Sequence, residues 1–144
     1  MKKIIAATLV AGLFASSGAF AAPVTVTLVT GYNTIGSVAT DINIARQFTL
    51  TAIAARAGFI KNSFDATLSA NVIAGVVDDA ANNRLGVVAG SNKGYTVFTG
   101  SSVGGSVSQC GDPVAKTTTN LAASLVVTGT VDLTMANGCN RTPT

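Results

Sequence analysis

Hydrophobic and polar residues alternate in several short stretches of this chain, and a period of two predicts β-strands. In residues 24–29, Val24, Val26 and Leu28 fall on one side of such a strand, and two threonines fall on the other. Gly31 and the polar residues after it are predicted to end the strand. The pattern therefore predicts a half-buried first strand whose apolar side is made by these three residues.

The clearest alternation lies in residues 127–135. Its apolar positions and one glycine are separated by threonines and one aspartate: Val127, Gly129, Val131, Leu133 and Met135 alternate with Thr128, Thr130, Asp132 and Thr134. This regularity predicts a well-formed final strand. The Ala-Asn-Gly sequence at 136–138 is typical of a turn and is predicted to end it.

Residues 41–57 fit two patterns. Asp41 is of a type that caps helices and Gly58 of a type that ends them, and several apolar residues between them recur at helical spacing. In residues 47–54, however, the apolar residues alternate with threonines. Because Thr and Ile are β-branched and favour strands, we expect a strand over 47–54. A helix over 41–57 remains the alternative.

Further strands and a long loop are predicted from the rest of the chain. Strands are expected over 63–70, 72–77, 84–89 and 95–99, the last two forming a hairpin through 90–94, and a Gly/Ser-rich loop over 100–113. Short strands at nearly regular spacing are typical of a small antiparallel β-sandwich or barrel. The predicted fold class is therefore all-β, and it becomes α+β if residues 41–57 form a helix.

A polar run from Asp78 to Asn83 follows the predicted strand 72–77 and is typical of a turn. Asp78 and Asp79 are interpreted as solvated turn residues. With Asn82 they also offer the oxygen ligands that Ca²⁺ prefers. Their spacing does not match a known calcium loop, so we expect no metal site, and nothing else in the chain indicates a cofactor.

The first 21 residues carry the three features of a secretory signal peptide. Two lysines supply positive charge, residues 4–14 are almost entirely apolar, and Ala19-Phe20-Ala21 is a small-x-small cleavage site. A membrane span needs about 20 continuous apolar residues, and neither this stretch nor any later one is long enough. We therefore expect cleavage after Ala21 and a single secreted β-rich domain, residues 22–144, without a membrane span.

Composition argues against an enzyme and against a nucleic-acid partner. The chain has no His, Glu or Trp, so it lacks the side chain most often used for proton transfer near neutral pH. Once the two lysines of the predicted signal peptide are removed, seven of the nine basic residues remain against six acidic ones, and they form no basic cluster. We expect neither catalysis nor nucleic-acid binding.

Cys110 and Cys139 are the two cysteines of the chain. An even pair in an exported protein is most simply a disulfide, because the destination is oxidising. A zinc site is disfavoured, since there is no C-x-x-C and no His to complete a ligand set. We expect the bridge to pin the loop 100–113 to the end of the final strand.

An exported β-domain that is rich in Thr, Val, Ala and Gly, lacks His and carries one disulfide resembles the fimbrial (pilin) subunits of Gram-negative bacteria. The resemblance covers the general character of residues 22–144 and includes no diagnostic motif. In the chaperone–usher family it implies a pilin-like or Ig-like incomplete sandwich, completed when the N-terminal strand of one subunit inserts into the next. Val24, Val26 and Leu28 lie in the right place for such a donor strand.

Two functions are open at this point. The resemblance implies a structural, adhesive subunit of a surface fibre, exported through the periplasm, which polymerises with its own copies and meets a periplasmic chaperone and an outer-membrane assembly partner. The alternative is a secreted or periplasmic β-domain that binds a carbohydrate or protein through loops such as 100–113. Fold class does not choose between them. Whether the N-terminal strand pairs within its own domain or with a neighbour is the main question that the sequence leaves open, and polymerisation of the purified protein is the observation that separates the two functions.

Overall fold

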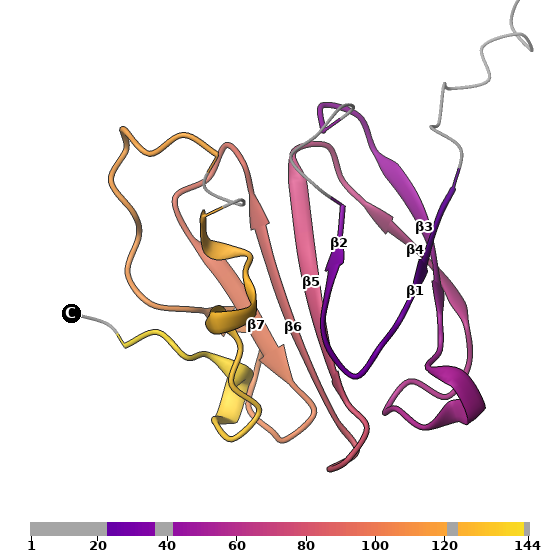
Figure 1. Cartoon of the computed structure of the whole chain (residues 1–144). Helices are drawn as coiled ribbons and strands as arrows, with labels where there is room; N and C mark the ends of the chain where they lie inside the picture. Colours follow the sequence, from indigo (N-terminus) through magenta and orange to yellow (C-terminus); the bar gives the residue numbers. More distant parts are fainter. Residues whose placement is uncertain (1–22, 37–41, 121–123, 143–144) are drawn as a thin grey trace, which may run out of the picture.

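The computed structural model describes residues 23–36, 42–120 and 124–142, which form eight strands and three short 3-10 turns (Figure 1). The strands are β1 (Val24–Thr27), β2 (Gly31–Ile35), β3 (Arg46–Thr51), β4 (Phe64–Leu68), β5 (Val72–Asp79), β6 (Arg84–Ser91), β7 (Val97–Ser101) and β8 (Ser108–Gln109). The turns are η1 (Ala54–Arg56), η2 (Thr128–Thr130) and η3 (Ala136–Gly138). The predicted all-β class is confirmed.

The strands form two sheets, which lie side by side in Figure 1. One has three strands in the order β1-β3-β4, with β1 parallel to β3 and β3 antiparallel to β4. The other has five strands in the order β2-β5-β6-β7-β8, and every pair in it is antiparallel. The predicted antiparallel arrangement thus holds except at β1.

Two hydrophobic clusters lie on opposite faces of the five-stranded sheet. The inter-sheet cluster joins the two sheets, and its buried members are Leu28, Ile35, Phe48, Leu50 and Val76. The C-terminal cluster lies where the last described segment, residues 124–142, covers the other face, and its buried members are Ile73, Val88, Val97, Cys110 and Val126. Both faces of the five-stranded sheet therefore contribute to the interior, which explains the runs of apolar residues in its central strands.

Tyr32 links the C-terminal cluster to β2. Its hydroxyl donates to the Val126 carbonyl oxygen at 2.8 Å. Burial raises the pKa of Tyr32 above the usual value near 10, so the phenol is protonated and able to donate this bond across the neutral range. The contact fixes the last segment against the sheet through a polar group in an otherwise apolar cluster.

Residues 41–57 do not form a helix in their described part, so the α+β alternative is wrong. β3 occupies Arg46–Thr51 with alternating burial, Phe48 and Leu50 inward, and only the single turn η1 follows it. Strand formation prevails because this alternation places two large apolar side chains in the inter-sheet cluster, where a helix would place fewer of them on one face.

The strands predicted over 63–70, 72–77, 84–89 and 95–99 are confirmed as β4 to β7, with the expected β6–β7 hairpin. Two predictions need correction. β2 forms where the sequence predicted only the end of a strand. The loop 100–113 is shorter than expected, because β7 continues to Ser101 and β8 follows at Ser108–Gln109.

The strand predicted over 127–135 is wrong. This segment contains η2, a single bridge between Val131 and Cys139, and a turn, and the bonds that shape it are local. The Asp132 carboxylate accepts hydrogen bonds from the backbone N–H and hydroxyl of Thr134 at 2.8 and 2.7 Å. Such side-chain bonds offer the backbone an alternative to a sheet ladder.

The apolar side chains of the same segment are divided between interior and solvent. A Cβ atom on Gly86 would lie 2.5 Å from Leu133 Cδ2 and 2.7 Å from Val131 Cγ1, so these two residues pack flat on the bare backbone of β6. Met135, by contrast, is 50% exposed. The segment covers a sheet face as an irregular layer.

The predicted disulfide is confirmed between Cys110 and Cys139, which are 29 positions apart. It joins the residue after β8 to the end of η3. Among the described residues no helix is long and apolar enough to cross a membrane.

Candidate strand-exchange site

The N-terminal strand β1 lies at one edge of the three-stranded sheet of its own chain. It runs parallel to β3, with Val24 opposite Phe48 and Val26 opposite Leu50. The pairing continues past the strand, since the Leu28 N–H donates to the Thr51 carbonyl oxygen at 2.9 Å. In this structure the strand therefore pairs within its own domain.

The three residues proposed for a donor strand are buried to different degrees. Leu28 is 1% exposed and belongs to the inter-sheet cluster, and Val26 packs against that cluster while half-buried. Val24 falls on the same side by register, opposite Phe48 as Val26 is opposite Leu50, but it is 54% exposed. It is the first residue of β1, at the edge of the sheet. One side chain, Leu28, thus anchors β1 in the core.

Three residues separate β1 from β2: Leu28, which still pairs with Thr51 and belongs to the donor segment, and then Val29 and Thr30, which we call the hinge. Asn33, which is buried in β2, holds it in place. Its Oδ1 accepts a hydrogen bond from the Val29 N–H at 2.8 Å, and its Nδ2 donates to the carbonyl oxygens of Val29 at 2.8 Å and Gly31 at 2.9 Å. A single amide therefore satisfies three backbone groups that a sharp reversal would otherwise leave unpaired.

Thr30 ties the hinge to the end of β5. Its hydroxyl donates to the Asp78 carbonyl oxygen at 3.4 Å and accepts from the Ala80 N–H at 3.1 Å. The Asp78 carboxylate, which is fully buried, accepts hydrogen bonds from the N–H groups of Phe59 at 2.6 Å and Ile60 at 3.2 Å. The hinge and the β3–β4 connection are thus both fastened at Asp78.

The interpretation of Asp78 as a solvated turn residue is therefore wrong. Gly58 explains why a carboxylate is tolerated there: a Cβ atom on Gly58 would lie 2.4 Å from Asp78 Oδ2, so only glycine lets the backbone donors approach so closely. A buried carboxylate that accepts two backbone N–H bonds has replaced the water it lost.

Asp79 behaves as predicted for a turn. It accepts hydrogen bonds from the Asn82 side chain at 2.7 Å and from the N–H groups of Ala81 and Asn82. These bonds, led by the Asn82 side chain, hold the pKa of Asp79 below its usual value of 3.8. Within the described part of the chain no three His, Cys, Asp or Glu residues are grouped so that they could hold a metal ion.

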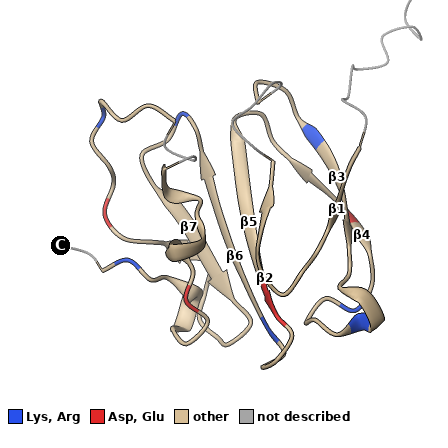
Figure 2. Ribbon diagram, viewed as in Figure 1, with Lys and Arg blue, Asp and Glu red and all other residues tan. Residues whose placement is uncertain are grey.

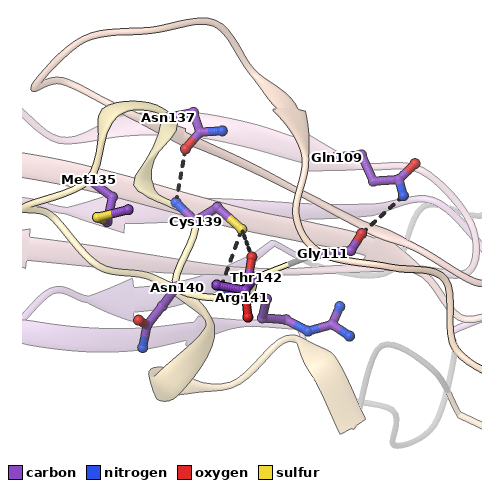
Figure 3. Close-up of a pocket in the computed structure, with 8 residues that line it drawn as sticks. All are labelled: Gln109, Gly111, Met135, Asn137, Cys139, Asn140, Arg141 and Thr142. Atoms are coloured by element: carbon purple, nitrogen blue, oxygen red, sulfur yellow. Dashed lines mark hydrogen bonds between the residues drawn. The ribbon is translucent and has the colours of Figure 1, made fainter. Parts of the chain in front are cut away.

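A second feature is a shallow groove of about 290 Å³ beside the disulfide (Figure 3). Eight residues line it: Gln109, Gly111, Met135, Asn137, Cys139, Asn140, Arg141 and Thr142. The Arg141 guanidinium donates to the carbonyl oxygens of Cys110 at 2.9 Å and Asp112 at 3.3 Å, and Asn140 donates to that of Gly129 at 3.0 Å. The polar groups of the groove are therefore held largely by the backbone of their own chain.

Sequence reasoning identified the strand and the disulfide but missed the residues that hold the hinge. Asn33 and Thr30 are polar residues next to a glycine, which is the usual signature of a turn, and Asp78 stands next to a second aspartate. No pattern in the sequence marks these three as buried or as partners of one another. Compared with known proteins, the chain matches no family model, no curated protein and no solved structure.

Proposed function

We propose that the exported chain is a structural subunit of an extracellular surface fibre of the fimbrial type, with a role in adhesion. Its copies join by strand exchange, in which β1 leaves its own β3 and takes the equivalent place in the next copy. The observation that carries this proposal is the placement of β1, a four-residue edge strand at the start of the described chain that is joined to β2 by the short hinge.

Exchange of β1 is energetically cheap because the swapped strand makes the same contacts in a neighbour as in its own chain. Swapping of identical elements is a low-cost route to assembly, and short connections favour it. Release of β1 also breaks few buried contacts, because three of its four residues are exposed and Leu28 makes the main buried contact. A chain of such exchanges gives a fibre.

A subunit with β1 released exposes the apolar residues that Leu28 and Val26 cover. Phe48 and Leu50, now 4% and 1% exposed, belong to that cluster. Exposed apolar surface of this kind promotes aggregation. We therefore include in the proposal a periplasmic chaperone that covers the site before assembly, an outer-membrane assembly partner, and a location on the surface of a Gram-negative cell.

A cysteine pair across β1 and β3 tests the proposal directly. Thr25 and Thr49 are opposite one another in the register, so Thr25→Cys with Thr49→Cys places two thiols side by side. After assembly and oxidation, exchanged strands give covalent ladders on a non-reducing denaturing gel, because the bond then joins different chains. Closed monomers give a single band.

Gln47→Cys with Thr67→Cys is the matched control. These residues are opposite one another in β3 and β4, and both are exposed. Strand exchange leaves their pairing within one chain, so the control runs as a monomer under every condition. The proposal is overturned if material assembled from the Thr25–Thr49 pair also runs as a monomer, or if residues 22–144 never assemble.

The alternative function, a secreted module that binds a carbohydrate or protein, is favoured by the groove beside the disulfide. Gly111, which lines it, has φ +69°, and a Cβ atom there would lie 2.7 Å from Arg141 Cβ, so Arg141 packs directly on the backbone of the groove. Titration of the isotope-labelled monomer with a panel of oligosaccharides tests it. Chemical-shift changes confined to residues 109–111 and 135–142 support this function, and their absence with every sugar contradicts a carbohydrate ligand.

A further inference from the structure

The two sulfur atoms of the disulfide have different surroundings. Cys110 is 0% exposed and belongs to the C-terminal cluster, where it packs with four buried apolar residues: Ile73, Val88, Val97 and Val126. Cys139 is only partly buried, and it lines the groove beside the bridge (Figure 3), whereas Cys110 is not among the eight lining residues. Solvent therefore reaches the bridge from the side of Cys139.

This difference in exposure decides how the bridge can react. Disulfides are exchanged when a thiolate attacks one of the two sulfur atoms, and the rate depends on access to the attacked atom. An external thiolate reaches Cys139 through the groove. To reach Cys110 it would have to pass through the buried residues of the C-terminal cluster. Attack on the folded protein is therefore directed to Cys139, and Cys110 becomes the leaving group.

Arg141 makes the groove suitable for an anionic reagent. It is the one charged residue among the eight that line the groove, and Figure 2 shows few charged positions over the ribbon as a whole. Its backbone N–H donates to Cys139 Sγ at 3.4 Å, its carbonyl oxygen lies 3.3 Å from the same sulfur, and its guanidinium donates to the Cys110 carbonyl oxygen. A fixed positive charge in a concave site raises the local concentration of anions such as thiolates.

We propose that Cys139 is a thiol-exchange site, which takes small thiol-bearing peptides of the glutathione class from the groove. The groove, of about 290 Å³, lies near the lower end of the size range of small-molecule pockets, and this suits the thiol end of such a peptide. The proposal does not depend on strand exchange, because β1 belongs to the other sheet. It shares the groove with the alternative function but requires no carbohydrate ligand.

The exchange transfers the peptide to one defined sulfur. The peptide thiolate attacks Cys139 Sγ and forms a new disulfide with it. The bond between Cys110 and Cys139 breaks, and its electron pair stays on Cys110 Sγ, which then takes a proton from water. In the reverse reaction, the Cys110 thiolate attacks Cys139 Sγ and expels the peptide thiolate, which restores the bridge.

The surroundings of Cys110 also set the pace of the reaction. Apolar surroundings disfavour a thiolate, so Cys110 is a poor leaving group. We therefore expect the exchange to be slow as well as selective, with glutathione on Cys139 and a buried free thiol at Cys110.

Trapping the mixed disulfide tests the proposal on the parent protein. Oxidised, folded residues 22–144 are incubated with excess reduced glutathione, quenched with acid, alkylated and digested with trypsin. Cleavage after Lys116 separates the two cysteines, so mass spectrometry assigns the adduct. At early times glutathione should be found on Cys139 at least about tenfold more often than on Cys110, because only Cys139 is accessible. In urea the two cysteines should carry similar amounts, which shows that the preference comes from the fold.

Cys110→Ala and Cys139→Ala form a matched pair, because both lack the bridge and they differ only in the thiol that remains. With oxidised glutathione, the Cys139 thiol of the first variant should react at least about tenfold faster than the Cys110 thiol of the second, provided that circular dichroism shows both to be folded. If either variant is unfolded, the parent experiment decides.

The proposal is overturned if the folded parent carries glutathione on Cys110 as often as on Cys139, or if no adduct forms before the protein unfolds. It is also overturned if the two folded variants react at the same rate.

Discussion

Several polar side chains inside this protein bond to backbone atoms of irregular segments, some of them nearby in the sequence and some distant. Asn33 bonds to three backbone groups in and beside the hinge, and Asp78 accepts bonds from two N–H groups of the β3–β4 connection. The Thr130 hydroxyl donates to the Leu125 carbonyl oxygen. Each bond fixes an irregular segment that no ladder supports. Thr99 is an exception: it is fully buried, and its hydroxyl has no hydrogen-bond partner among the described residues.

Thr99→Val should therefore stabilise the protein, by about 1 kcal/mol, because a methyl group of the same shape removes the cost of a buried, unpaired hydroxyl. Thr130→Val is the matched control, which should destabilise by about 1–2 kcal/mol because it leaves the Leu125 carbonyl oxygen without its donor. Urea unfolding of both variants measures the difference. Equal losses in the two variants would show that the Thr99 hydroxyl has a partner.

At the scale of elements, alternation predicts a strand well where a partner edge is available. β3, β5, β6 and β7 were predictable because their apolar residues face a layer that the same chain supplies. Residues 127–135 alternate more clearly, yet they lie across the face of the sheet. Asp132 and Thr134 satisfy their backbone locally. Periodicity indicates which side chains share a face of a strand. It does not indicate whether a sheet has a free edge with which that strand can pair.

β2 and the hinge were not predictable for a related reason. Gly31 and Asn33 are residues of turns, and a sequence pattern cannot show that an asparagine is buried and bonded to backbone four positions away. The disulfide, by contrast, followed from counting two cysteines, and it was confirmed. Contacts between residues far apart in the sequence, such as the close approach of Asp78 to Gly58, become visible only in three dimensions.

Asn33→Ala should loosen the hinge. It leaves the Val29 N–H and two carbonyl oxygens without their partner, which should cost about 1–3 kcal/mol of stability. Because the closed hinge is weakened and the contacts of β1 itself are kept, ladders from the Thr25–Thr49 cysteine pair should form faster in this background. Amide hydrogen exchange at Val29 and the rate of ladder formation measure the two effects.

Asn62→Ala, at an exposed position between β3 and β4, serves as the control and should change neither quantity. If Asn33→Ala accelerates exchange of the Val29 amide and leaves the ladders unchanged, Asn33 supports the hinge but does not limit strand exchange.

At the scale of the whole molecule, the two faces of the five-stranded sheet are covered by different means. One face receives a second sheet over part of its width, and the other receives an irregular segment held by the disulfide and by Tyr32. The covered parts give a single fold with two clusters. On the first of these faces, no residue of β7 or β8 belongs to the inter-sheet cluster.

Replacing both cysteines, Cys110→Ala with Cys139→Ala, should destabilise the protein by about 3–4 kcal/mol, as expected for a closed loop of this length on the chain-entropy argument. The loss should be uneven. Residues 124–142 and β8 should lose hydrogen-exchange protection first, while β3 and β4 keep theirs, because the inter-sheet cluster does not include the bridge. A uniform loss would mean that the two clusters unfold as one unit.

The position of the disulfide-held segment also has a consequence for timing. A chain that emerges from its N-terminus, from a ribosome or through a membrane pore, presents β5, β6 and β7 long before Val126 and Cys139 arrive. Until then the C-terminal cluster lacks the residues that cover it, whereas every member of the inter-sheet cluster has already emerged. The two clusters are therefore expected to close in sequence order, and the C-terminal cluster is completed only when nearly the entire polypeptide is out.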